Sequence, residues 1–255
     1  MMKLSMHGGQ LQVRRWVMRR ASTLTLAMLL HLLLVSVAAA QQLPMSCGAL
    51  RVEGRFGPFD YRADRFEAKG HSFRSHEALL AIVEGAHFTP EVEAGLRGKS
   101  TTRPAGDISY TLHAFPNHHR ALTAMSKVSM REGTDKPYGS PYTVDCWFQR
   151  AIVWRSDDLI VRLIYANHLT QTKRLKDAAA QADIVASNAG DSAFTHLNVG
   201  LVFYDMGNFD AALKHAHKAI ELGLNNMTLK DLLVKAGKWS ETAPPAQQRV
   251  PEDKQ

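Results

Sequence analysis

Histidine is the one reactive residue type that is enriched in this sequence, with 12 copies among 255 residues. The histidines that could contribute to a site are His71, His76, His87, His113, His118, His119, His215 and His217. Two ligands of one metal ion on a helix must be three or four residues apart to share a face. His113 and His118 are five residues apart with Pro116 between them, and His119 points away from its neighbour. We therefore predict no metal site and expect these histidines at the surface or at helix starts.

The sequence lacks the signatures of common catalytic sites. Glu77 follows His76, but the second histidine of a zinc-protease helix is missing. A Gly-x-Ser-x-Gly elbow, a P-loop and a dinucleotide-binding glycine motif are also missing. Asp157 and Asp158 fall where a helix is expected to start, and the helix dipole accounts for acidic residues there. The sequence predicts a protein that is not an enzyme and needs no cofactor.

Residues 1–40 have the features of a secretory signal peptide. Arg19 and Arg20 precede an apolar stretch over residues 24–37, and three alanines then form a small-residue cleavage pattern before Gln41. A retained membrane anchor is the alternative, but residues 24–40, the apolar stretch with the three alanines, number about 17 and fall short of the ~20 that a spanning helix needs. We predict export to the periplasm with cleavage near residue 40.

The composition is that of a globular chain, with 45% hydrophobic and 22% charged residues. The formal net charge is +7, but residues 1–40 hold five basic residues and no acidic one, and the remainder carries 26 basic and 24 acidic residues. Binding to nucleic acid needs a concentrated basic face. We therefore predict no nucleic-acid partner, and contact with a membrane only if the leader is uncleaved.

Cys47 and Cys146 are the only cysteines in the chain. In an exported protein two cysteines favour one disulfide, and neither residue lies in a Cys-x-x-Cys redox motif. Such a bridge closes a loop of about 100 residues, which stabilises the fold by up to ~4–5 kcal/mol. Two buried thiols that never meet are the alternative. We predict the Cys47–Cys146 disulfide.

Glycine, proline and apolar residues divide the first part of the mature chain. Residues 41–106 form an N-terminal segment with short helices, and its start is irregular or a short β-hairpin. Residues 107–158 indicate atypical helical repeats, in which Asp107 and Asn117 are expected to begin helices. The loop 131–143 contains two glycines and two prolines and cannot be regular structure.

Farther along the chain, helical patterns recur at a fixed spacing, from residues 159–192 to residues 193–226. In residues 193–226 the positions that carry the pattern are Gly200, Phe203, Gly207, Phe209, Ala212 and Ala219. The segment resembles one complete tetratricopeptide repeat, with departures at His196, Ala216 and Leu224. The resemblance implies pairs of antiparallel helices whose small residues let neighbours nest into one continuous core.

Residues 159–192 carry the same pattern more weakly, in the same register. The matching positions are Ala166, Leu169, Leu175, Ala178 and Val185. Only the second helix of a third unit is expected before them, because the loop 131–143 replaces its first half. Residues 227–239 are expected to form a capping helix, and residues 240–255 a disordered tail. The predicted fold is all-α, a tetratricopeptide-like α-α solenoid with an irregular or β-hairpin N-terminal segment.

The resemblance also implies a groove along the first helix of each repeat. The corresponding positions are Ile160, Leu163, Asn167, Phe194, Leu197, Asn198, Leu201 and Tyr204. They would form a largely apolar trough that suits an extended or helical segment of a partner protein. Leu163 stands where carboxylate-binding members of the family have a lysine, so recognition of a C-terminal carboxylate is not expected. The alternative is that these residues pack against residues 41–130.

The function expected from this resemblance is that of a protein–protein interaction module in the periplasm, a scaffold or adaptor in a complex of the cell envelope. Its partner would be a protein or peptide segment. The alternative is a His-rich metal-binding or hydrolytic envelope protein that uses residues 71–119.

Overall fold

A computed structural model of the protein describes residues 43–54, 56–62 and 76–241. The predicted signal peptide and nearly all of the predicted disordered tail lie outside these residues. Among the described residues the fold is all-α, with ten α-helices, one 3₁₀ helix and no strand. In chain order the helices are η1 (Met45–Cys47), α2 (His76–His87), α3 (Pro90–Glu93), α4 (Pro104–Ala114), α5 (His119–Glu132), α6 (Val144–Trp154), α7 (Leu159–Gln171), α8 (Leu175–Ser187), α9 (Ala193–Asp205), α10 (Phe209–Glu221) and α11 (Thr228–Lys235).

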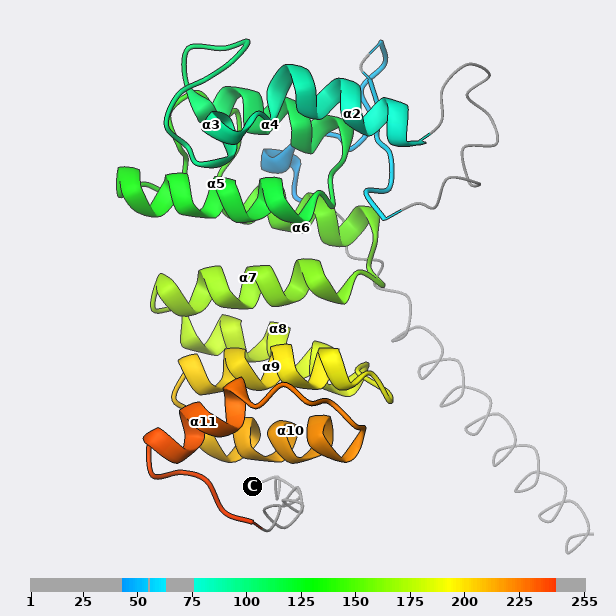
Figure 1. Cartoon of the computed structure of the whole chain (residues 1–255). Helices are drawn as coiled ribbons and strands as arrows, with labels where there is room; N and C mark the ends of the chain where they lie inside the picture. The colour runs from blue at the N-terminus through cyan, green and yellow to red at the C-terminus, as the bar shows by residue number, and fades with distance from the viewer. Residues whose placement is uncertain (1–42, 55, 63–75, 242–255) are drawn as a thin grey trace, which may run out of the picture. The chain divides into compact units, whose positions relative to one another are not determined.

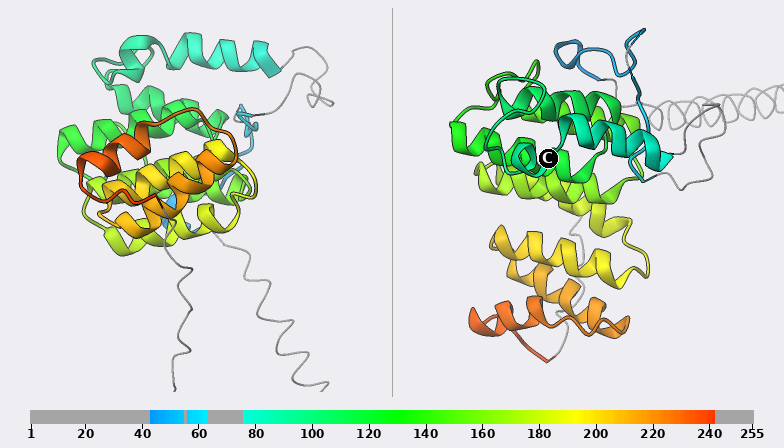
Figure 2. Two further views of the ribbon diagram at one scale, coloured as in Figure 1. Left: turned by 60° about the horizontal axis from the view of Figure 1, so that its bottom comes forward. Right: turned by 45° about the horizontal axis from the view of Figure 1, so that its top comes forward.

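The helices stack in chain order, with α2–α4 at one end and α9–α11 at the other (Figures 1 and 2). From α4 onward, each helix packs against the next one along the chain. The odd-numbered helices also contact one another in succession, from α3 to α5, α7, α9 and α11. We call α5, α7 and α9 the first-helix layer, because each begins a helical hairpin.

The two hairpins α7–α8 and α9–α10 are built alike. Each of their four helices has 13 residues, and the interval from the start of α7 to the start of α9 equals the interval from α8 to α10. Polar side chains cap three of the four, since Asp158, Ser192 and Asn208 accept hydrogen bonds from backbone N–H groups of the first turn. The helix pattern predicted for residues 159–226 is therefore observed.

The core of these hairpins depends on small residues at the helix contacts. Ala166, Ala178, Ala212 and Ala219 are all buried. A Cβ atom placed on Gly200 would overlap Cδ2 of Leu229 and lie 3.2 Å from Cβ of His215. A side chain at position 200 would therefore force Leu229 to shift, and the glycine lets α9 approach its neighbours without that shift.

The helix pair α5–α6, which precedes these two hairpins, differs from the prediction. Helix α5 contacts α7 as α7 contacts α9, so α5 is the first helix that the loop 131–143 was expected to replace. The irregular residues 133–143 instead connect α5 to α6. Because this connection is longer than the turns of the later hairpins, the interval from His119 at the start of α5 to Leu159 at the start of α7 exceeds the interval from Leu159 to Ala193.

Two predicted helix starts are wrong in detail. Helix α4 begins at Pro104, and the buried Asp107 accepts hydrogen bonds from the backbone N–H groups of Lys99, Ser100 and Thr101 in the preceding loop. Helix α5 is capped by His118, whose Nδ1 accepts from the N–H of Ala121. The side chain of Asn117 does not cap the helix, because it bonds to the N-terminal segment and to the α6–α7 turn.

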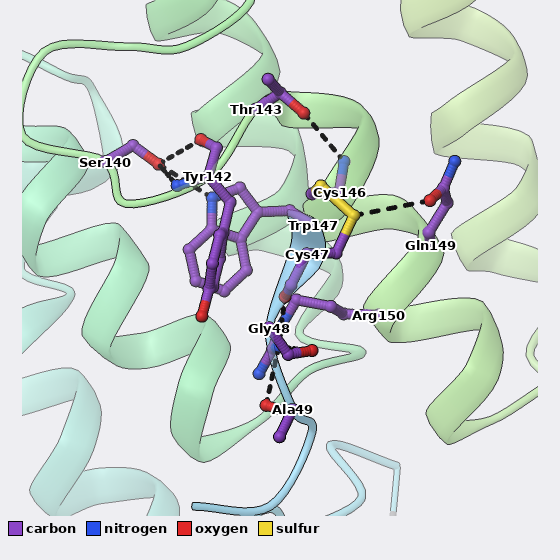
Figure 3. Close-up of a disulfide and its surroundings, with 10 residues drawn as sticks. All are labelled: Cys47, Gly48, Ala49, Ser140, Tyr142, Thr143, Cys146, Trp147, Gln149 and Arg150. Atoms are coloured by element: carbon purple, nitrogen blue, oxygen red, sulfur yellow. Dashed lines mark hydrogen bonds between the residues drawn. A yellow bond between two sulfur atoms is a disulfide. The ribbon is translucent and has the colours of Figure 1, made fainter. Parts of the chain in front are cut away.

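The start of the N-terminal segment, described over residues 43–54 and 56–62, contains η1 and no strand, so it is irregular rather than a β-hairpin. Cys47 forms a disulfide with Cys146 on α6, across 99 positions of sequence. The buried Arg150, one turn farther along α6, donates from Nη1 to the carbonyl oxygens of Cys47 and Ala49 at 2.8 and 2.9 Å (Figure 3). Its guanidinium lies 5.5 Å from the ring centroid of Trp147.

Residues 56–62 join the ends of α4 and α6. Asp60 accepts hydrogen bonds from Asn117 Nδ2 at 2.7 Å and from Arg155 Nε at 2.5 Å. The N–H of Tyr61 donates to Asn117 Oδ1 at 2.9 Å, and Trp154 Nε1 donates to the carbonyl of Phe59 at 3.2 Å. Burial alone would raise the pKa of Asp60, but the hydrogen bonds from its neighbours lower it well below its usual range.

Within residues 43–54, 56–62 and 76–241, none of the helices combines the length and the apolar character needed to cross a bilayer.

Candidate partner-binding surface

The predicted groove positions lie on α7 and α9, which are adjacent in the first-helix layer. Ile160 and Phe194 occupy the second position of these helices and are 49% and 65% exposed. Asn167 is also exposed, and Asn198, Leu201 and Tyr204 are half-buried. Two large apolar side chains thus stand in solvent at equivalent places on neighbouring helices.

Two of the predicted groove residues are not at the surface. Leu163 and Leu197, the fifth residues of α7 and α9, belong to the same buried apolar cluster. Each lies one turn after an exposed residue and faces inward, because the close packing of α7 on α9 covers that position. The open part of the surface is therefore narrower than the sequence predicts and centres on Ile160 and Phe194.

The surface continues onto α5, which the sequence analysis missed. Arg120, Thr123 and Lys127 are the second, fifth and ninth residues of α5, the positions that Ile160, Leu163 and Asn167 occupy on α7. Together with Glu93, His119 and Ala124 they line a depression of about 170 Å³. The polar first turn of α5, directly after Pro116 and Asn117, could have indicated this part of the surface. The spacing of the later repeats could not, because it does not extend back to α5.

The α5 end of the surface is polar and charged. Arg120 Nε donates to Glu93 at 2.9 Å, and its Nη1 donates to Glu84 at 3.2 Å. The hydrogen bond from Arg120 lowers the pKa of Glu93, so the pair stays ionised at neutral pH. Lys127 is exposed and forms no ion pair within residues 76–241. The first-helix layer therefore changes from charged at α5 to apolar at α9.

The histidines of region 71–119 have separate structural partners. His87 bonds to Asp107 at 2.8 Å, and His113 accepts from Arg150 Nη2 at 3.2 Å. Residue 71 and the side chain of His76 lie outside the described part of the chain. In the part that is described, no group of three His, Cys, Asp or Glu side chains is placed to hold a metal ion.

His118 and His119 point to different carboxylates. The Nδ1 of His118 is an acceptor, so its Nε2 carries the proton and donates to Glu84 at 3.0 Å. Burial lowers the pKa of His118, although the bond to Glu84 partly offsets this effect. His119 Nε2 lies 2.9 Å from Asp158, whose carboxylate also accepts from Asn117. The contacts with Asp158 fix the α4–α5 turn against the α6–α7 turn, and the contact with Glu84 fixes it against α2.

No protein-family model, no curated protein and no solved structure matches this chain. The geometry of the first-helix layer is therefore what supports a function. Its two distinguishing features are the exposed apolar pair Ile160 and Phe194 and the charged depression on α5.

Proposed function

We propose that this chain is an exported protein-interaction module of the tetratricopeptide type, which binds a segment of a partner protein along α5, α7 and α9. The observation that carries the proposal is the exposure of Ile160 and Phe194 at equivalent positions of adjacent helices. Exposed apolar side chains grouped on one surface mark sites of protein contact. Recognition of an apolar segment in a shallow groove needs such anchors at a regular spacing.

The repeat assignment is supported by the internal symmetry of the two hairpins. Their helices share lengths and register, and the close approach at Gly200 is the packing that this repeat family requires. Alternation of first and second helices leaves one face of the first-helix layer without a covering helix. The proposed partner lies on that face, with its apolar residues against α7 and α9 and its polar residues against α5.

The proposed periplasmic location is supported by two independent features. The disulfide between Cys47 and Cys146 is compatible with an oxidising compartment. The pattern of residues 1–40 is that of a cleaved leader. The mass of the mature protein tests this directly: cleavage gives an N-terminus near Gln41, whereas an intact leader in the membrane pellet contradicts export in soluble form.

Site-specific photo-crosslinking in the native envelope tests the binding surface. A photoreactive amino acid replaces Ile160 or Phe194 in two separate variants, and Lys214 in a control. Lys214 is exposed on α10, a second helix. We expect the same partner adduct from positions 160 and 194 and none from position 214. No adduct at either position, or equal adducts at all three, contradicts the proposal.

A further inference from the structure

A pair of buried histidines lies between α9 and α10. The Nδ1 atoms of His196 and His215 are 2.8 Å apart, and the two rings stack with centroids 5.1 Å apart. Both residues are at least nine-tenths buried, with 7% and 6% of their surface exposed. The preceding hairpin has a polar contact at the same register, where Arg162 Nη1 donates to Gln181 Oε1 at 2.9 Å. The pair therefore occupies a position that joins the two helices of a hairpin.

The partners of His196 fix where the protons lie. Its Nε2 is 3.0 Å from the carbonyl oxygen of Gly190, which only accepts, so Nε2 carries a proton. In the neutral ring Nδ1 is then an acceptor, and His215 must donate to it from its own Nδ1. The contact requires His196 to be neutral at Nδ1, whereas a proton added at Nε2 of His215 would keep the bond but place a charge in this buried site. A proton added at Nδ1 of His196 would place two N–H groups against each other and abolish the bond.

The surroundings of the two rings are largely apolar. The ring of Phe203, on α9, stacks on His215 with a centroid distance of 5.6 Å, and Leu229 of α11 packs beside the same contact at Gly200. Burial, together with the smaller effects of His196 and Lys214, lowers the pKa of His215 to about 4. No charged group of α7, α8 or α11 contributes to this shift, and neither imidazole has a carboxylate partner among residues 76–241.

We propose that the His196–His215 contact makes the α9–α10 hairpin acid-sensitive. It joins the two helices while both rings are neutral, loses its hydrogen bond when His196 is protonated, and gains a buried charge with no carboxylate partner among the described residues when His215 is protonated. Helix α9 carries Phe194 and Leu201 of the candidate surface, so opening of this hairpin would also disturb that surface. The inference stands on the contact itself and holds whether or not a partner binds there.

The direction of the pH effect follows from linkage. Because the folded pKa of His215 lies below the value of ~6.5 for an unfolded histidine, the unfolded chain binds more protons between these values. The stability from this group is fully present above pH ~6.5 and is lost as the pH falls toward 4. Between pH 7.5 and 5.0, His215 alone is expected to lower the folding equilibrium constant roughly 30-fold.

His215→Gln is the matched variant, because a glutamine amide can still donate to His196 but cannot be protonated. Urea unfolding of both full-length proteins at pH 7.5 and 5.0 gives the comparison. His118 and His168 are buried in both proteins, so their contributions to the pH dependence cancel in the comparison. We expect the wild-type folding constant to fall roughly 30-fold more than that of the variant. Equal falls for the two proteins overturn the proposal.

A second measurement needs no variant. Titration of the histidine ring protons by NMR in the wild-type protein gives the pKa of His215 directly. A value well below 6 is expected, with loss of hydrogen-exchange protection in α9 and α10 over the same pH range. An ordinary pKa near ~6.5 overturns the proposal even if His215→Gln does not fold.

Discussion

Helices α7–α10 and the helices that precede them differ in how they are held together. The four later helices are equal in length and are joined by short turns, whereas α3–α6 vary from 4 to 14 residues. The earlier helices are joined to distant segments by the Cys47–Cys146 disulfide and by Arg150. A regular unit is stabilised by its nearest neighbours alone, while an irregular one needs contacts between residues far apart in sequence.

The largest effect is expected from removing the disulfide. The double change Cys47→Ser and Cys146→Ser opens a loop of 99 residues, and the free energy of unfolding should fall by up to ~4–5 kcal/mol. Urea unfolding measures this, with reduced wild-type protein as the control. Hydrogen exchange should accelerate in α4–α6 and stay unchanged in α9 and α10. Equal stability of the oxidised and reduced proteins would show that the contacts of Arg150 and residues 56–62 hold the N-terminal segment without the disulfide.

A smaller effect is expected from Gly200→Leu, which tests the close packing of the regular hairpins. Overpacking against Leu229 and His215 should lower stability by ~1–3 kcal/mol, although leucine favours the helix by ~0.8 kcal/mol. Ala212→Leu, at a wholly buried position, should have a similar effect. The control Lys214→Ala, on an exposed side chain, should stay within ~0.5 kcal/mol. A Gly200→Leu protein as stable as wild type in urea would refute the repeat packing.

The smallest effect is expected at the turns of the two hairpins. Lys173 has a positive φ of 64°, and its counterpart in the next repeat is Gly207 with a φ of 79°. A lysine is strained in this conformation and glycine is not. Lys173→Gly should therefore raise the free energy of unfolding by up to ~1 kcal/mol. The gain is reduced because glycine increases the conformational entropy of the unfolded chain. Urea unfolding measures both this change and the converse Gly207→Lys, which should lower stability; a gain there would show that the turns are not equivalent.

The regular half of the fold could be predicted from sequence because its determinants are local. Small residues such as Gly200 and Ala212 mark the helix contacts, and a polar cap such as Asp158 marks a helix start. The disulfide followed from the number of cysteines. The role of α5 was missed because the longer connection from α5 to α6 changes the spacing that the later repeats share.

The details of the surface depend on contacts that no local pattern contains. Leu163 and Leu197 are apolar groove positions of the repeat pattern, as are Ile160 and Phe194. Only the packing of α7 on α9 determines that the first two side chains are buried and the other two exposed. Asn117 was expected to cap a helix, but bonds to Asp60 and Asp158 use its side chain. These partners are 57 and 41 residues away in sequence, so the competition between them is visible only in three dimensions.

The bond between Cys47 and Cys146 also closes residues 47–146 into a covalent ring that includes α2–α5. A single protease cut in the exposed loop 99–103, or between Gly133 and Tyr142, opens this ring, and the disulfide keeps the two resulting pieces joined. A cut after residue 146 separates the polypeptide into two pieces. Cleavage within residues 47–146 and cleavage after residue 146 therefore give different results on a gel. Without a reducing agent, protein cut within residues 47–146 keeps its full mass, and its two pieces separate only after a thiol reduces the disulfide.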